Sequence, residues 1–180
     1  RAQCRMGRRA ISRRYSIKAF ESIEAGRPID TLYYYWDALR KGRGAAPQLS
    51  DFRPFEIFPD SILKHLSWID TNDENPENYR LWNHHGGRME QILGSLEGQY
   101  VGAYPNAMHR NASIREYQLC KVLKRPIYHQ IDQKMFGACR IYRRMLMPLL
   151  DERGNVVRIA YGIRTSHSHS QFVTHLDPQT

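Results

Sequence analysis

The sequence predicts an α+β domain with a five-stranded antiparallel sheet, helices on one face of that sheet and an N-terminal helix. Two observations carry the prediction. The last third of the chain alternates apolar and polar residues with a period of two, which is typical of half-buried strands. Earlier segments repeat apolar residues at helical spacing, and predicted strands lie on both sides of a helical stretch. That order favours an antiparallel sheet covered by helices.

Two long strands at 136–150 and 155–164 form the predicted centre of the fold. The second strand alternates an apolar face with a face that carries Arg158 and Arg164. The joining residues 151–155 have turn chemistry, because Gly154 accepts the positive φ that a short hairpin loop requires. Pro148 cannot donate a ladder hydrogen bond, so we expect it near a strand end or a sheet edge.

The other elements follow from punctuation and periodicity. Asp30 can cap a helix that runs to about Lys41 and carries one apolar stripe: Ile29, Leu32, Tyr33, Trp36 and Leu39. The remaining elements are, in order, strands at 63–70 and 78–84, helices at 88–93 and 107–123, and a strand at 127–134.

Composition divides the chain into three parts. Residues 1–27 hold eight of the 27 Lys and Arg and only two of the 18 Asp and Glu, and we interpret them as a basic N-terminal arm. Residues 28–165 form the domain, and residues 166–180 are a polar, His-rich tail. Such an arm is either a solvated leader or a contact for nucleic acid or an acidic membrane. No apolar run reaches the ~18 residues of a membrane span. Three separated cysteines indicate a reducing compartment, so we expect a cytoplasmic protein.

Catalytic motifs are absent from the sequence. It has no Gly-x-Ser-x-Gly elbow, no phosphate-binding loop, no His-Glu-x-x-His and no Cys-x-x-Cys. We therefore expect a protein that is not an enzyme.

Four motifs resemble those of PAS proteins. Residues 35–43 read YWDALRKGR, close to the pattern YWxxLRxGR, and residues 147–154 read MPLLDERG, close to LPLxDxxG. Between them lie an acidic and proline motif and a short helix between glycines, carried by Asp51, Pro54, Phe55, Pro59, Gly86, Gly94 and Gly98. The last glycine interval is one residue shorter than in the family. Over residues 30–165 the chain resembles the alphaproteobacterial family of small single-domain PAS proteins.

The resemblance implies a sensory or regulatory module in bacterial signalling. PAS domains bind a small ligand between sheet and helices, or pair through their N-terminal helices. The side chains that we expect around a ligand are Trp82, Arg88, Met89, Ile92, Tyr104, His109, Met145 and Tyr161. The apolar members of this set also suit a core that needs no ligand, and the sequence favours that interpretation over a pocket.

The cofactor stays unassigned. His109 lies near the position at which haem-binding PAS domains hold iron, but lone histidines are more often structural. A flavin photosensor would need a cysteine in the run 86–98, which has none. His84 and His85 point to opposite faces of a strand, which does not suit one metal ion.

Three partners follow from the sequence. Tyr34, Tyr35 and Trp36 offer apolar surface for a homodimer through the N-terminal helix, and a signalling protein is a second expected partner. The alternative function is nucleic-acid association, with weak non-specific binding by residues 1–27. Residues Arg140, Tyr142 and Arg144 share one strand face, as in proteins that stack bases, although the body beyond the arm is nearly neutral.

Overall fold

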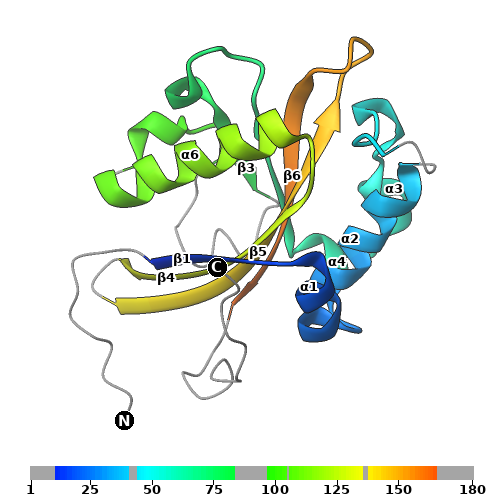
Figure 1. The fold of residues 1–180 in the computed structure, drawn as a ribbon, viewed down its shortest axis with the longest axis horizontal. Coiled ribbons are helices and arrows are strands. Elements are labelled where there is room, and N and C mark those ends of the chain that lie inside the picture. Colours follow the sequence, from blue (N-terminus) through cyan, green and yellow to red (C-terminus); the bar gives the residue numbers. More distant parts are fainter. Residues whose placement is uncertain (1–10, 41–43, 84–96, 105, 136–137, 166–180) are drawn as a thin grey trace.

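The computed structural model describes residues 11–40, 44–83, 97–104, 106–135 and 138–165. These residues form one antiparallel sheet of six strands in the order β1-β4-β5-β6-β2-β3 (Figure 1). The strands are β1 Ile11–Tyr15, β2 Leu66–Asp70, β3 Arg80–Asn83, β4 Ile127–Met135, β5 Ala138–Leu150 and β6 Val156–Thr165. The α-helices are α1 Ile17–Glu24, α2 Pro28–Leu39, α3 Pro54–Ile57, α4 Asp60–Leu63 and α6 Ala107–Leu123. Short 3-10 turns lie at Leu49–Asp51, Pro76–Asn78 and Val101–Ala103.

The α+β class and the antiparallel sheet are confirmed, but the sheet has one strand more than predicted among the described residues. The extra strand, β1, lies in the segment interpreted as an arm and pairs with β4 from Ile11↔Asp132 to Tyr15↔Tyr128. The sequence hid it because its central residues are Ser and Arg, which show no apolar alternation. The next helix, α1, is capped by Ser16 and buries Phe20 completely. Residues 11–24 are therefore part of the folded domain.

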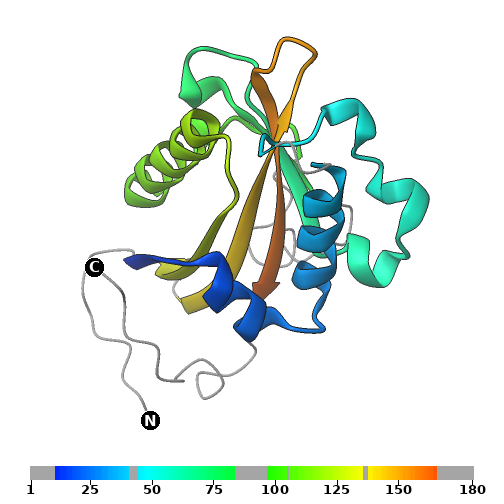
Figure 2. The same cartoon turned by 45° about the vertical axis from the view of Figure 1, so that its right-hand side comes forward.

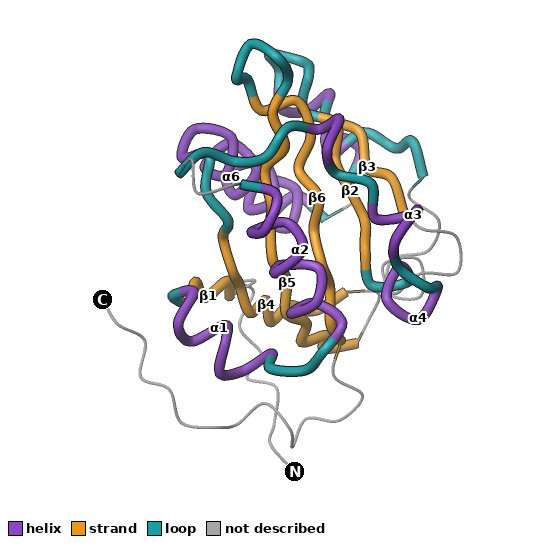
Figure 3. The backbone as a smooth tube through the Cα atoms, turned by 90° about the vertical axis from the view of Figure 1, so that its right-hand side faces the viewer, coloured by secondary structure: helices purple, strands orange, loops and turns teal. Residues whose placement is uncertain are grey.

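Helices cover both faces of the sheet, not one (Figure 2). On β5, Arg144 contacts α6, whereas its neighbour Arg143 faces Glu24 of α1 on the other side. α1 and α2 lie side by side across β4, β5 and β6 (Figure 3). Helices must bury both faces of the sheet because β5 carries apolar residues at consecutive positions from Met145 to Met147. Consecutive residues of a strand point to opposite faces, so both faces of β5 are apolar.

The second helix docks through close contacts that the sequence only partly signalled. Trp36 is fully buried, and its Nε1 donates to the Pro148 carbonyl at 2.9 Å. That carbonyl is available because β4 stops pairing with β5 at Leu146, which leaves Pro148 on an open edge as predicted. At Gly162 of β6 a Cβ would lie 2.8 Å from Cγ1 of Ile29, so only glycine permits this approach.

Burial changes the basis of the dimer prediction. Trp36 is core, and Tyr35 packs against Phe52 and Phe58 at ring-centroid distances of 5.4 and 5.2 Å. Of the three aromatic residues proposed for the interface, Tyr34 is 49% exposed. A homodimer stays a prediction, and Trp36→Glu would disrupt the core whatever the oligomeric state.

Most predicted boundaries hold within a few residues. The helix at 107–123 is confirmed, and Asn106 caps it by accepting from the His109 amide at 3.0 Å. Gly154 adopts φ +79° in the hairpin turn, as expected. The predicted strand 63–70 begins later, at Leu66, because α4 occupies the residues before it. The predicted helix 88–93 lies outside the described residues.

A buried carboxylate joins α1 to the sheet. Glu24 has no exposed area, and Arg164 donates to it twice, from Nε at 2.7 Å and from Nη2 at 3.0 Å. The Tyr128 hydroxyl donates to the same carboxylate at 2.6 Å, and Arg143 Nη1 lies 3.9 Å away. We call these four residues the α1 clamp. Residues far apart in sequence are thereby tied together on one face.

Candidate functional site

The opposite face, beneath α6, carries an unusual number of polar side chains for a core. The buried residues of α6 recur at helical spacing along one stripe: His109, Ser113, Tyr117 and Cys120. Facing them, the strand residues of the same sheet face include His129 on β4, Tyr142 and Arg144 on β5, and Tyr161 on β6. Long side chains from three adjacent strands therefore meet one side of a single helix.

Arg144 is the centre of this group. It is 2% exposed and forms an ion pair with Glu116 of α6. Its Nη1 donates to the Tyr117 hydroxyl at 3.2 Å, and its guanidinium carbon lies 5.3 Å from the centre of that ring. Burial alone would raise the pKa of Glu116, but Arg144 and His129 lower it below the ordinary value. Glu116 is therefore ionised and neutralises the buried guanidinium.

His129 lies beside this ion pair without joining it by a hydrogen bond. Its side chain has no exposed area, and Nε2 lies 3.8 Å from Oε1 of Glu116. Burial lowers its pKa from 6.5 to about 4, more than Glu116 raises it, so the ring is neutral near pH 7.

Three buried polar atoms in this group make no hydrogen bond to the described part of the chain: Nδ1 and Nε2 of His129 and Nε of Arg144. The hydroxyl of Tyr161 is also buried, and Ser67 on β2 interacts with it. A buried polar atom without a partner costs roughly 1–3 kcal/mol, so several on one face need an explanation. We call Glu116, Tyr117, His129, Arg144 and Tyr161 the α6 cluster.

Aromatic residues extend this cluster along α6. Tyr104 stacks on His109 with ring centroids 5.2 Å apart and an interplanar angle of 10°. Burial raises the pKa of Tyr104, and the neighbouring phenols of Tyr117 and Tyr161 raise it further. Burial also raises the pKa of Tyr161, so both phenols keep their protons. Aromatic rings therefore lie beside the polar atoms of the cluster.

The structure separates the side chains that the sequence grouped as ligand contacts. Tyr104, His109 and Tyr161 lie on the α6 side. Met145 and Trp82 lie on the opposite face. Met145 precedes Leu146, which is the partner of Tyr161. Trp82 pairs with Trp68, whose partner on β6 is Ala160, the residue before Tyr161. Trp82 donates from Nε1 to Asp70 at 2.8 Å there. The other three, Arg88, Met89 and Ile92, lie outside the described residues.

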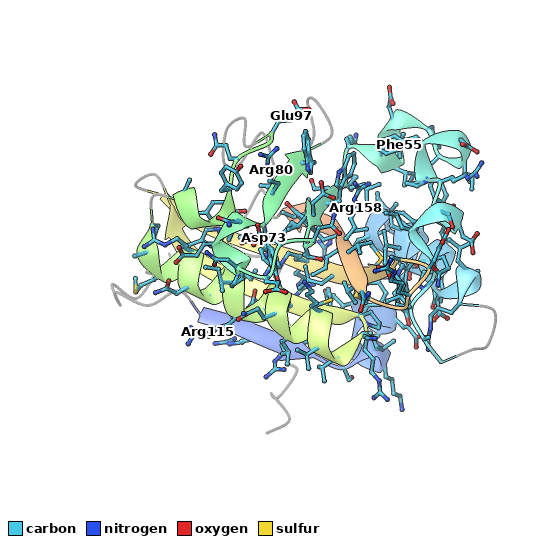
Figure 4. All side chains as sticks on the ribbon, turned by 90° about the horizontal axis from the view of Figure 1, so that it is seen from above. Phe55, Asp73, Arg80, Glu97, Arg115 and Arg158 are labelled. Atoms are coloured by element: carbon cyan, nitrogen blue, oxygen red, sulfur yellow. The ribbon has the colours of Figure 1, made fainter. Side chains whose placement is uncertain are left out.

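The sequence did not single out Glu116, His129 or Arg144 as ligand contacts. The alternative prediction places Tyr142 and Arg144 on a strand face that stacks bases, but both side chains are buried beneath α6. An arginine inside an apolar strand is the signal that was available, because a buried guanidinium needs a carboxylate partner. In Figure 4 the exposed residues Phe55 and Arg80 lie toward one rim of the molecule, and the exposed Arg115 of α6 lies toward the opposite one.

Two further kinds of site are absent from the part of the chain that the structure describes. The described residues contain no group of three or more His, Cys, Asp or Glu placed to hold a metal ion. No helix among them has the length and apolar character needed to cross a membrane. Cys120 is a buried free thiol whose pKa is raised by burial, so it is a poor nucleophile.

The fold and the α6 cluster define the chain as an α+β domain with a helix-covered antiparallel sheet and a polar core on one side. Comparison with protein-family models, curated proteins and solved structures found no match.

Proposed function

We propose that the chain is a PAS-like sensory or regulatory module, not an enzyme, and that it binds a small ligand between α6 and the sheet. The six-stranded antiparallel sheet with its helices is compatible with a PAS-like fold. The motifs at 35–43 and 147–154 support the same family. A cytoplasmic location in bacterial signalling belongs to this proposal.

One observation carries the ligand-binding part. The unpartnered atoms of His129 and Arg144 come from two neighbouring strands and lie, with the buried Tyr161 hydroxyl of β6, on the face that α6 covers. A core that served packing alone would place apolar groups at these positions, since each unpartnered polar atom lowers stability. Binding sites retain such atoms because a ligand supplies their partners.

Protein from its native host offers the direct test. Native mass spectrometry gives the mass of the folded chain, and denaturing spectra give the mass of the polypeptide alone. We expect the native mass to exceed the polypeptide mass by a small molecule that unfolding releases. Equal masses, together with no stabilisation by any member of a metabolite library, would contradict the proposal.

A protein partner is the second function that a specific observation favours. Phe55 and Ile57 on α3 are 51% and 56% exposed, and Phe55 packs edge-on against Trp68 at 5.4 Å. Exposed aromatic residues of this kind are enriched at interfaces. Phe55→Glu should abolish recovery of a signalling partner and leave the thermal midpoint almost unchanged.

A further inference from the structure

The charges of the α6 cluster limit what a ligand there can be. Arg144 and Glu116 form a neutral pair, and His129 is neutral near pH 7. Three protons are left for a ligand: Nε–H of Arg144, the hydroxyl proton of Tyr161, whose oxygen lies beside Ser67, and one N–H of the neutral His129 ring. The other nitrogen of His129 accepts. Donors outnumber acceptors, so the cluster favours a ligand that accepts hydrogen bonds.

We infer that the α6 cluster binds a small organic monoanion, a carboxylate attached to a flat apolar body. This inference rests on the ligand-binding function proposed above. Nε of Arg144 and the Tyr161 hydroxyl donate to the carboxylate oxygens, and the aromatic rings of Tyr104, Tyr117 and Tyr142 contact the apolar body.

Other ligand classes suit these residues less well. A phosphate dianion would bring two negative charges to a guanidinium that Glu116 already neutralises. An apolar ligand would leave every donor unpartnered, and a cation would face Arg144. A neutral amide can accept the same hydrogen bonds, but hydrogen bonds to an ionised acceptor are about twice as strong.

Binding of a monoanion is coupled to a proton. The groups around His129 are Glu116 and, beyond it, His109 on α6, Arg144 on β5, and Arg14 and Ser12 on β1. A new negative charge beside the ring favours its protonated form, which restores neutrality. The pKa of His129 then rises on binding, so carboxylate affinity increases as pH falls.

Matched probes test the ligand class. We compare benzoate with benzamide and acetate with acetamide, adding inorganic phosphate, by calorimetry on the full chain from pH 8 to 5.5. We expect each carboxylate to bind more tightly than its amide, by about tenfold for one charge-assisted hydrogen bond. The carboxylate affinity should increase toward low pH, and the ¹⁵N signals of the His129 ring should shift on binding.

Tyr161→Phe is the discriminating variant, because it removes only a hydroxyl that interacts with Ser67 and makes no other hydrogen bond to the described residues. It should retain the thermal midpoint and lower benzoate affinity about tenfold. Tyr33→Phe is the matched control on the α2 side of the sheet and should leave benzoate affinity unchanged.

The outcomes separate the two proposals. Equal binding of amide and carboxylate, or release of a neutral compound by host-purified protein, would overturn the monoanion inference and leave ligand binding intact. No binding of any carboxylate at millimolar concentration, or full benzoate affinity in Tyr161→Phe, would also overturn it. The ligand-binding function fails only by the mass measurement and the library.

Discussion

The α1 clamp should be among the most sensitive points of the fold. Glu24→Gln retains the shape of the side chain but removes its charge. Arg164 and Arg143 are 14% and 8% exposed at the side chain, so both would keep a positive charge away from water. Breaking a buried ion pair in this way costs about 3–5 kcal/mol. For a chain of 180 residues we expect the thermal midpoint to fall by about 6–20 °C, at about 2–4 °C per kcal/mol.

Urea denaturation followed by Trp fluorescence measures this loss. Glu56→Gln is the matched control, because its partner Arg53 is 3.6 Å away and both side chains are more than 60% exposed. That variant should have no measurable effect. Since the loss arises from removing the Glu24 charge beside buried guanidinium groups, Glu24→Gln combined with Arg164→Gln should cost less than the sum of the single changes. Additive losses, or a Glu24→Gln variant as stable as the unmodified chain, would refute this reasoning.

Three further predictions concern other parts of the fold. The pKa of His129 is about 4 in the folded protein, below its ordinary 6.5. The free energy of unfolding should therefore fall as the pH decreases from 6.5 to 4, by about 3 kcal/mol at 1.4 kcal/mol per pKa unit. His129→Gln should flatten this dependence of the thermal midpoint on pH. Gly162→Ala places a methyl group against Ile29 and should cost about 1–3 kcal/mol in urea denaturation; unchanged stability would mean that α2 does not approach β6 this closely. Deletion of residues 1–27 should lower the thermal midpoint strongly, because β1, Phe20 and Glu24 are lost. Deletion of residues 1–10 should weaken only binding to nucleic acid. Equal midpoints for the two deletions would exclude a structural role for residues 11–24.

The hairpin of β5 and β6 shows which features of the fold can be predicted from the sequence and which cannot. Its strands and its Gly154 turn follow from periodicity and turn chemistry, but the faces on which Met145 and Tyr161 lie do not. Leu150 pairs with Val156, yet Leu149 pairs with Arg158, so one extra residue is inserted into β6 at this point. A regular ladder continued from Leu150 would pair Met145 with Tyr161 on one face. The bulge shifts the register by one residue and sends the two side chains to opposite faces.

The α6 cluster was hidden for a related reason. Its members come from α6, β4, β5 and β6, and their meeting depends on strand register and on the angle at which α6 crosses the sheet. Periodicity fixes which residues share a face within one strand, but not which rows of different strands coincide. The β1 strand was missed on other grounds, since an edge strand with exposed Arg13 and Arg14 needs no apolar alternation.

The N-terminal segment connects the two polar groups of the core. Ser12 of β1 donates to Glu116 on the α6 side, and Glu24, at the end of the helix that follows, accepts from Arg164 on the other side. Residues 11–24 thus pass around one edge of the sheet and contact both faces. On β4 and β5 the partners alternate, with Tyr128 and Arg143 in the α1 clamp and His129 and Arg144 in the α6 cluster. The ligand proposed for the α6 cluster would change the charge around Glu116, which contacts β1 through Ser12. It could shift the docking of residues 11–24 only by its difference in affinity for the docked and undocked states.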